Sequence, residues 1–355
     1  MRVLLIPGIG VDPHYGGQGS FCRYLAEGLV ELGHYVEISG GENWVRFCKQ
    51  WSISLHSDQS KAAKGADVIH INGPGLRRAA GELISRNKVL LTHQDHRYIC
   101  PATVAWSRDG CIENGSHGPC QYCPNRDVWS RARLEMLRFV VGLCCNVAVS
   151  SYLLKRLSLP NGHAILSPIR GEPSSTPGNP SVVAFAGRIV PEKGVDVLVR
   201  AVSKIRQIEL EIAGDGPMLP QLRQLAEDLG IATRVHFTGP QSLEGVRDLY
   251  LRSSIVCVPS VWQEPYGYAA AEALALGRTL VVSDRGALPE LVGQNRGWVC
   301  RADDPDDWAK TLRDILENDE ERIRRCREAN RFVAEELAPV PVAKRYVALY
   351  ENSLR

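Results

Sequence analysis

The feature that most constrains the fold is a repeated alternation of short apolar segments with longer segments of helical spacing. Between residues 21 and 32, leucines recur at Leu25, Leu29 and Leu32, which is the spacing of one face of a helix. Strands alternating with helices predict a parallel sheet covered by helices on both faces. In the first half of the chain the apolar segments expected to form strands are Val3–Pro7, Tyr35–Ile38, Val68–Ile71, Val89–Leu91 and Cys145–Val149.

The alternation stops once and then begins again. Residues 167–180 read SPIRGEPSSTPGNP, with four prolines and two glycines, which is typical of an interdomain linker. A chain of 355 residues is long enough for two hydrophobic cores. We therefore predict two doubly wound Rossmann-like α/β domains that face each other across a cleft. The strands expected after the linker are Val182–Ala186, Leu210–Ala213, Val235–Thr238, Ile255–Val258, Thr279–Val282 and Trp298–Cys300.

The expected domains follow from these breaks in the pattern. The first comprises residues 1–166, the linker residues 167–180, and the second residues 181–338, and a C-terminal helix over 339–355 is expected to return to the first domain. Within the first domain, residues 93–128 form a long irregular segment rich in Cys, Pro, Gly and His, and a loop of this length usually has a function. In doubly wound sheets, ligands bind where strands end, so residues that directly follow strands are the candidates for a site.

Composition excludes several classes of protein. A formal net charge of +2 gives no basic field of the kind that nucleic acid attracts. The run Val3–Pro7 is too short for a signal peptide, and the longest apolar stretch, Phe139–Val149, is too short to span a membrane. We expect a cytoplasmic protein without a nucleic-acid partner, whose only membrane contact would be peripheral, at the inner face of the membrane.

The first candidate segment is GIGVDPHYGGQGS, which follows the first strand. Gly16 and Gly17 would let the backbone approach a ligand closely, and the helix that follows would offer its N–H groups to an anion. The spacing is neither the dinucleotide fingerprint nor a Walker loop. An ordinary strand-to-helix turn is the alternative interpretation.

A second candidate is the loop that follows the first strand of the second domain. Arg188 and Lys193 lie five residues apart there, just before a helix expected to begin near Gly194. Two cations beside a helix N-terminus suit a diphosphate, because arginine offers a planar fork and lysine a point charge. A solvated charged turn is the alternative.

The most informative segment, residues 259–273, reads PSVWQEPYGYAAAEA and follows the strand Ile255–Val258. Pro265 suits an early helix position, and the N–H groups near Gly267, Tyr268 and Ala269 would then point toward a ligand. Glu264 precedes this helix, and Glu272 is expected about two turns into it, among alanines. A carboxylate in such apolar surroundings is costly unless it has hydrogen-bond donors, such as sugar or ribose hydroxyls. An exposed helix face is the alternative.

Four cysteines are clustered in the irregular loop. Cys120 and Cys123 form a C-x2-C pair of the kind found in metal knuckles, and Cys100 and Cys111 lie upstream, with His117 as a spare ligand. A structural zinc would order such a loop. Free thiols remain an alternative, and disulfides a less favoured one in the cytosol.

Taken together, these segments resemble retaining glycosyltransferase family 4, whose members have the two-domain GT-B fold. The resemblance is carried by GRIVPEKGVDVL, EIAGDGP, FTGP, the E-x7-E segment from Glu264 to Glu272, and SDRGALPELV. The first half matches more loosely, through GGQGSFCRYLAEGLVELGHYVEI. No single piece is specific, but the ordered set is, and it spans most of the chain.

The resemblance implies a role for each matching residue. Arg188 and Lys193 would hold the donor diphosphate, which Gly16 and Gly17 would approach from the first domain. Glu272 would bind the nucleotide ribose, and Glu264 the transferred sugar beside the Gly267–Ala269 backbone. The family transfers sugar with retention and needs no metal or other cofactor. The D-x-D sequence Asp304-Pro305-Asp306 is expected to cap a helix instead of binding a metal.

The chain departs from the family pattern in one place. The loop after the fourth strand usually holds a His-Asp pair followed by Cys-Pro, but here Gln94 precedes Asp95 and Cys100. Either the alignment slips by one, which would make His93 the catalytic histidine, or Gln94 supplies the hydrogen bond to the sugar. Glutamine can donate and accept hydrogen bonds but does not titrate near neutral pH.

The predicted function is therefore retaining transfer of a hexose from a UDP- or GDP-sugar. The acceptor would be a hydroxyl of a glycan, a lipid-linked sugar or a small molecule. An epimerase or a phosphorylase is a second enzyme class for this fold, although a phosphorylase would need a longer chain and a cofactor lysine. A nucleotide-sugar-binding protein or partner subunit without turnover is the non-enzyme alternative, and only Gln94 favours it.

Overall fold

The structure is a computed structural model. It describes residues 1–8, 11–13, 16–73, 89–96, 98–99, 135–136, 138–174 and 178–354. The chain folds into two compact units, Met1–Ile169 together with Glu336–Arg355, and Arg170–Glu335.

The first unit is built on a seven-stranded sheet in which every neighbouring pair of strands is parallel. Its order, β3-β2-β1-β4-β5-β6-β7, changes direction between β1 and β4, and this is the switch point of a doubly wound sheet. The central strands are buried along their whole length, as parallel strands covered on both faces are. The strands are β1 (Arg2–Ile6), β2 (Tyr35–Ser39), β3 (Ser54–His56), β4 (Val68–Asn72), β5 (Val89–His93), β6 (Cys145–Ala148) and β7 (Gly162–Ala164).

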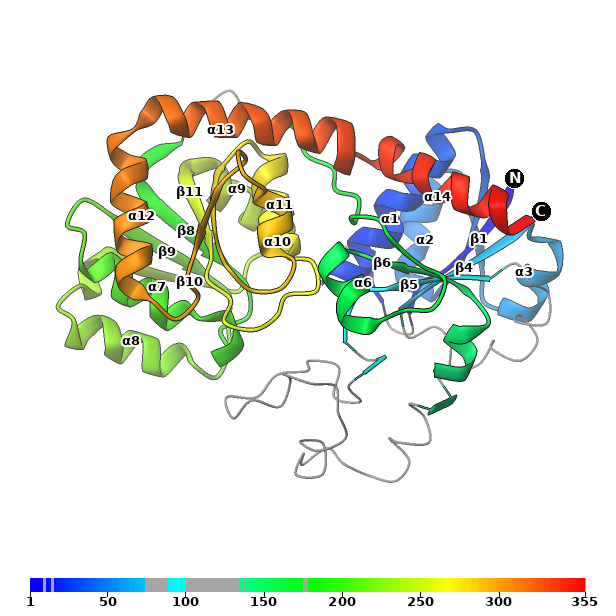
Figure 1. Cartoon of the computed structure of the whole chain (residues 1–355), viewed down its shortest axis with the longest axis horizontal. Coiled ribbons are helices and arrows are strands. Elements are labelled where there is room, and N and C mark those ends of the chain that lie inside the picture. The colour runs from blue at the N-terminus through cyan, green and yellow to red at the C-terminus, as the bar shows by residue number, and fades with distance from the viewer. Residues whose placement is uncertain are drawn as a thin grey trace. The chain divides into compact units, whose positions relative to one another are not determined.

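The C-terminal helix α14 (Pro339–Leu354) packs beside α1 (Gly16–Glu31) in this unit (Figure 1). The two helices approach so closely that a Cβ on Gly28 would lie 2.2 Å from the Pro339 carbonyl oxygen. Among the described residues, this unit also contains the helices α2 (Val45–Gln50), α3 (Gln59–Gly65) and α6 (Ser151–Leu157), with a short 3-10 turn at Glu42–Trp44.

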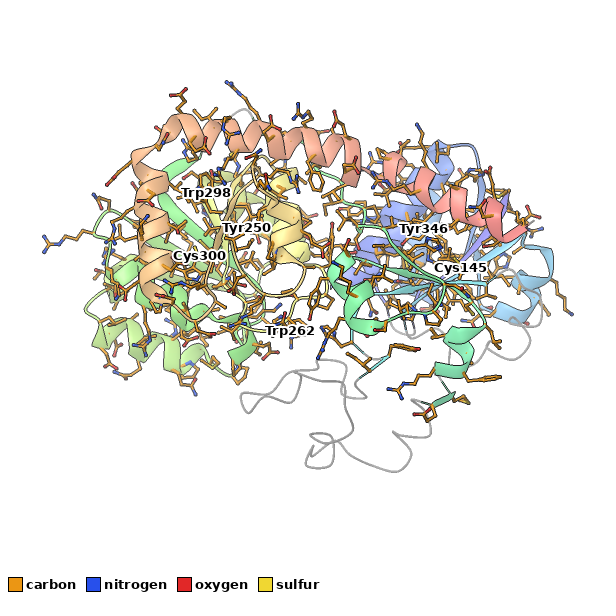
Figure 2. The ribbon with its side chains drawn as sticks, in the orientation of Figure 1. Cys145, Tyr250, Trp262, Trp298, Cys300 and Tyr346 are labelled. Atoms are coloured by element: carbon orange, nitrogen blue, oxygen red, sulfur yellow. The ribbon has the colours of Figure 1, made fainter. Side chains whose placement is uncertain are left out.

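A buried polar network joins α14 to the centre of the sheet. His70 on β4 lies 2.7 Å from the Tyr350 hydroxyl through Nδ1 and 2.7 Å from the Thr92 hydroxyl through Nε2. Its ring also stacks on Tyr346, which is labelled in Figure 2. Complete burial lowers the pKa of His70 to about 3, so the imidazole is neutral in the folded protein.

The second unit repeats the same plan with six strands in the order β10-β9-β8-β11-β12-β13, again all parallel. Its switch point lies between β8 and β11, which are neighbours although they are far apart in sequence. The strands are β8 (Asn179–Ala186), β9 (Glu209–Ala213), β10 (Val235–Gly239), β11 (Ser253–Val258), β12 (Thr279–Ser283) and β13 (Trp298–Cys300).

Helices surround this second sheet, and Figure 1 shows α7, α8 and α12 beside its strands β8, β9 and β10. The core of the unit includes the buried side chains of Leu198, Ile212 and Trp308. The helices are α7 (Val195–Ser203), α8 (Leu219–Asp228), α9 (Leu243–Arg252), α10 (Tyr268–Ala275), α11 (Leu288–Val292), α12 (Pro305–Glu317) and α13 (Asp319–Phe332), with 3-10 turns η4 (Pro191–Lys193) and η5 (Ala232–Arg234). A π-helical turn, Val333–Leu337, follows α13.

The predicted fold class, two doubly wound α/β domains, is confirmed, and each expected strand is present with ends that differ by up to three residues. Two strands were not predicted, β3 and β7. Both have only three residues and lie at sheet edges, so neither carries a buried apolar run.

One local prediction was wrong. Pro265 lies in the loop before α10 and not within its first turn, because the helix begins only at Tyr268. Glu272 is therefore the fifth residue of α10, just over one turn in.

None of the helices in the described parts of the chain combines the length and the apolar character needed to cross a membrane.

Candidate functional site

The switch point of the second unit brings three loops together. The loop after β8 carries Arg188 and Lys193, the loop after β11 carries Glu264, and the loop after β12 carries Gly286. Because these strands are parallel and adjacent, their carboxyl ends lie at one edge of the sheet, which is where doubly wound folds bind ligands.

Backbone contacts hold these loops to one another. The Val261 amide donates to the Glu192 carbonyl at 3.0 Å, and the Ala287 amide donates to the Glu264 carbonyl at 2.8 Å. Two glycines with positive φ make the close approaches possible: a Cβ on Gly194 would lie 2.1 Å from the Pro259 oxygen, and one on Gly286 would lie 2.2 Å from the Glu264 oxygen. Neither position has room for a side chain.

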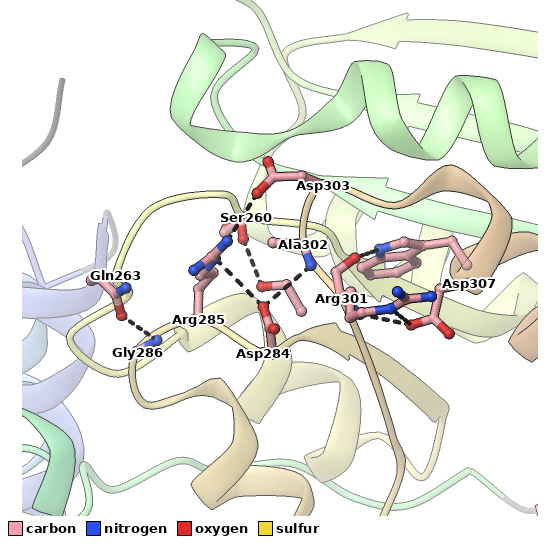
Figure 3. Close-up of polar contacts among 11 residues, drawn as sticks. Ser260, Gln263, Asp284, Arg285, Gly286, Arg301, Ala302, Asp303 and Asp307 are labelled. Carbon is pink, nitrogen blue, oxygen red and sulfur yellow. Dashed lines mark hydrogen bonds and ion pairs between the residues drawn. The ribbon is translucent and has the colours of Figure 1, made fainter. Parts of the chain in front are cut away.

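Side chains add further braces, which Figure 3 shows. Gln263 accepts a hydrogen bond from the Gly286 amide at 2.8 Å, and the Ser283 hydroxyl donates to the Ser260 carbonyl at 2.6 Å. Beyond them, Arg285 pairs with Asp303 at 2.9 Å. These bonds fix the backbone on both sides of Glu264.

Glu264 is the centre of a buried charged cluster. Its Oε1 lies 2.5 Å from Lys193 Nζ and accepts a hydrogen bond from the Ser260 hydroxyl at 2.7 Å. Burial raises the pKa of this carboxyl, but the charge of Lys193 and hydrogen bonding from Lys193, Trp262 and Ser260 outweigh burial and hold the pKa below its usual value. Glu264 is therefore a carboxylate at neutral pH.

The cations predicted to hold a diphosphate are both paired within the protein. Lys193 faces Glu264 on one side and lies 5.3 Å from the centre of the Trp262 ring, which Figure 2 labels. Arg188 is 63% exposed and pairs with Glu192, four residues further along the same loop, at 3.2 Å. Lys193 is thus enclosed and Arg188 faces solvent.

Helix α10 begins at Tyr268, among the residues whose N–H groups were predicted to hold phosphate or sugar oxygens. Gly267 is its N-terminal cap, so the N–H groups of Tyr268 and Ala269 lie in the first turn, at the positive end of the helix dipole. Glu272 is half-buried between the buried Ala271 and Ala273. Its charge adds to the burial that raises the pKa of Tyr266 well above its ordinary value.

In the first unit, the predicted glycines lie at the start of α1. Gly16 has a φ of +74° and begins the helix, and Gly17 follows it in the first turn. Gly19 packs directly against the preceding loop, where a Cβ would lie only 1.7 Å from the Asp12 carbonyl oxygen. The N-terminal end of α1 follows β1 and so lies beside the switch point of this sheet.

Gln94 belongs to a chain of amides at the ends of β4 and β5. Asn72 donates to the Gln18 carbonyl at 3.3 Å and to Cys22 Sγ at 3.1 Å, so its oxygen faces Gln94. Gln94 Nε2 donates to that oxygen at 2.6 Å. A backbone carbonyl at one end thus fixes the orientation of both amides.

The other residues of this loop face different surroundings. His93 is buried, and its Nε2 lies 3.0 Å from Asn146 Oδ1 on the neighbouring strand. Asp95 is half-buried, and His96 is fully buried near Tyr152. The structure thus brings Gln94 to the carboxyl end of the sheet and ties His93 into the sheet itself.

The cysteine cluster of Cys100, Cys111, Cys120 and Cys123 lies outside the described residues. Within the described part of the chain, no group of three or more His, Cys, Asp or Glu could hold a metal ion, and the seven cysteines there are free thiols. The interpretation of the D-x-D sequence as a helix cap is confirmed, because the Asp304 carboxylate accepts from the Asp306 and Asp307 amides.

Sequence reasoning missed four residues that organise these sites: Ser260, Trp262, Ser283 and Asn72. Ser260, Ser283 and Asn72 lie at or just beyond the end of a parallel strand, a position that could have marked them. Trp262 had no comparable signal, because its contact with Lys193 depends on how two distant loops meet.

The fold and this edge of the second sheet define a doubly wound α/β domain with a buried, charged cluster at its switch point. Residues 171–332 match the family model "Glycosyl transferases group 1". The match covers nearly all of the second unit and somewhat less than half of the chain.

Curated relatives agree with the family. D-inositol 3-phosphate glycosyltransferase from Mycolicibacterium smegmatis is 37% identical over 156 residues, which cover 42% of this chain and 36% of the relative. The enzyme of the same name from Corynebacterium efficiens is 36% identical over 165 residues, 43% of this chain and 38% of the relative. The matches thus span well under half the length of these relatives.

Solved structures resemble the whole chain. Sucrose-phosphate synthase from Thermosynechococcus elongatus has a TM-score of 0.75 at 19% identity, over 99% of this chain and 98% of that one. Anabaena HepE in complex with UDP has a TM-score of 0.73 at 16% identity, over 99% and 100%. At such identities the likeness shows the fold, and the fold is that of the GT-B glycosyltransferases.

Proposed function

We propose that the chain is a glycosyltransferase that takes a sugar from a nucleotide-sugar donor. The observation that carries this proposal is the cluster of Lys193, Glu264 and Ser260 beside the first turn of α10, in a domain that matches the family model of the glycosyl transferases group 1. It combines a cation and helix N–H groups for phosphates with a buried carboxylate that can accept hydrogen bonds from sugar hydroxyls.

The roles proposed for the residues follow from their chemistry. Arg188 and Lys193 would neutralise the diphosphate, and the N–H groups of Tyr268 and Ala269 would support the charge that grows on it as it leaves. Glu264 would accept from the sugar and Glu272 from the ribose. In the first unit, Gly16 and Gly17 at the start of α1 would face the donor phosphates.

The proposed reaction is retaining transfer, as in glycosyltransferase family 4. The bond between the anomeric carbon and the phosphate oxygen breaks, and the acceptor oxygen bonds to the same face of that carbon. The acceptor proton passes to the departing phosphate oxygen, so no metal and no titrating base is needed. The amide of Gln94 would then orient a hydroxyl, with Asp95 beside it.

Donor and acceptor are proposed as classes. The donor would be a UDP- or GDP-hexose, and HepE, which shares the fold, is described in complex with UDP. The acceptor would be a hydroxyl of a glycan, a lipid-linked sugar or a small molecule. We further propose a cytoplasmic enzyme that touches the membrane only peripherally, and a structural zinc on Cys100, Cys111, Cys120 and Cys123.

The test measures hydrolysis of UDP- and GDP-hexoses in the absence of acceptor. The nucleoside diphosphate that is released gives the rate. One donor should be hydrolysed slowly, and Lys193→Gln should lower the rate by about 100- to 1000-fold, the cost of losing a group that stabilises developing charge. Lys204→Gln is the matched control, because Lys204 is an exposed lysine of the same unit paired with Asp306. Tight binding with no hydrolysis of any donor would favour a binding protein or partner subunit.

A further inference from the structure

The residue proposed to hold the diphosphate and the residue proposed to hold the sugar contact each other. Lys193 Nζ lies 2.5 Å from Glu264 Oε1, the oxygen that also accepts from Ser260. The side chains are 20% and 7% exposed, so water screens the pair only partly.

A diphosphate cannot simply be added to this arrangement. The ammonium group of Lys193 has three N–H donors, but the Trp262 ring lies over it at 5.3 Å and Glu264 occupies another side. A phosphate that bonds to the same ammonium would lie within a few ångströms of the Glu264 carboxylate. Like charges at that distance repel strongly where water is excluded. A diphosphate also carries more negative charge than a carboxylate, so it competes well for the lysine.

We propose that Glu264 holds Lys193 until a donor diphosphate replaces it, and that only this exchange releases the carboxylate to the sugar. The inference rests on the proposed function and concerns the same site. Glu264 is then a specificity-determining residue as well as a sugar ligand. A sugar or nucleoside without phosphate groups carries no negative charge that could bind Lys193. Glu264 therefore stays paired with Lys193 and cannot bind the sugar.

The second cation supplies a comparison within the same loop. Arg188 also pairs with a carboxylate, Glu192, at 3.2 Å, but its side chain is 63% exposed. Glu192 is only 13% exposed, but the guanidinium of Arg188 is well hydrated, and a pair with a solvated partner contributes less than a buried one. Releasing Arg188 should therefore change phosphate binding far less than releasing Lys193.

The experiment measures the affinity of the full chain for UDP, GDP and ADP by titration calorimetry, and the tightest of the three becomes the probe. Glu264→Gln should bind that nucleotide about 5- to 20-fold more tightly than wild type, since Lys193 no longer has to leave a partner. Glu192→Gln should change the affinity by less than about twofold. A gain in affinity on removal of a proposed site residue is not expected from damage to the fold.

Two further variants separate exchange from plain repulsion between Glu264 and the phosphates. In a Lys193→Gln background, Glu264→Gln should not increase the affinity for the nucleotide. The gain in the wild-type background comes from releasing Lys193 from Glu264, and without the lysine there is no ion pair to release. Glu264→Asp keeps the negative charge but shortens the side chain out of contact with Lys193, so it too should bind more tightly. It serves alone if Lys193→Gln does not fold.

The outcomes distinguish the two levels of the argument. If wild type binds a nucleotide but Glu264→Gln and Glu264→Asp bind it no more tightly, the exchange is overturned and the donor site stands. If Glu264→Gln gains equally with and without Lys193, simple repulsion explains the gain and the exchange is again overturned. If no nucleotide binds any variant, both this inference and the proposed function fail.

Discussion

In the second unit a pair of full charges lies at the switch point, whereas in the first unit two hydrogen-bonded neutral amides lie at the corresponding strand ends, with Asp95 next to one of them in sequence. Lys193 and Glu264 form a buried ion pair braced by three loops. Gln94 and Asn72 form a chain of amide hydrogen bonds that ends on a backbone carbonyl of α1.

The difference suggests a division of labour. Charges suit a diphosphate, whose binding and departure are electrostatic, whereas fixed amides suit hydroxyl groups, whose orientation must be set without a change of charge. The neutral character of the first unit also extends inward, to the uncharged His70 between Thr92 and Tyr350. Three predictions test this contrast.

The largest effect is expected where the loops of the second unit touch. Gly286→Ala places a Cβ 2.2 Å from the Glu264 oxygen and 2.4 Å from its nitrogen, so the loop that carries the carboxylate must move. We expect the free energy of unfolding to fall by about 2–4 kcal/mol. Most of the donor-hydrolysis activity should be lost as well.

Gly230→Ala is the control for Gly286→Ala. Gly230 has nearly the same φ, +67° against +63°, but nothing lies within 4 Å of the position of its Cβ. It should lose only about 1 kcal/mol, the cost of a left-handed conformation. Urea unfolding of both variants makes the measurement, and equal losses would show that the close approach does not hold the site.

The next effect concerns acid stability of the first unit. The folded pKa of His70, about 3, lies below the unfolded value near 6.5, so the unfolded chain binds the extra proton. The contribution of His70 to stability is complete above pH 6.5 and is lost as the pH falls toward 3. Below about pH 6, wild type should lose about 1.4 kcal/mol per pH unit through this residue alone.

His70→Phe tests this reasoning. The variant should be less stable at pH 7, because Thr92 and Tyr350 lose a partner, but its stability should fall less steeply between pH 7 and pH 5. Hydrogen exchange of first-unit peptides across that range makes the measurement, with the exposed His163→Gln as control. Identical slopes in wild type and His70→Phe would contradict a neutral buried imidazole.

The smallest effect is expected at Gln94. An amide does not titrate, so the wild-type rate should show no inflection from this position near neutral pH. Gln94→His should add one between about pH 5.5 and 7.5, because histidine titrates near 6.5. The pH profile of donor hydrolysis makes the measurement, with the exposed Gln224→His as control. An unaltered profile for Gln94→His would place this residue away from the reaction.

Much of the fold could be predicted because its signals are local. Apolar runs such as Val89–Leu91 and Ile255–Val258 mark buried parallel strands, and the linker composition marks the break between repeats. The short edge strands β3 and β7 carry no such run, so they escaped prediction.

The site was predicted only in part, because its geometry is not local. Lys193 and Glu264 are 71 residues apart, and nothing in either segment shows that the two charges neutralise each other. The same holds for Asn72, whose side chain is oriented by α1, 54 residues away. Residue types at the strand ends predicted which side chains lie at the carboxyl edge of each sheet. Which of these side chains pair with one another depends on how the loops pack.

The central claim is that the second unit binds the donor through Lys193 and Glu272. The most direct test is a thermal-shift screen of wild type, Lys193→Ala and Glu272→Ala against UDP, GDP, ADP and their sugars. We predict that one nucleotide family raises the melting temperature of wild type and that both variants lose most of that shift. A shift that is unchanged in both variants would contradict the assignment of the donor site.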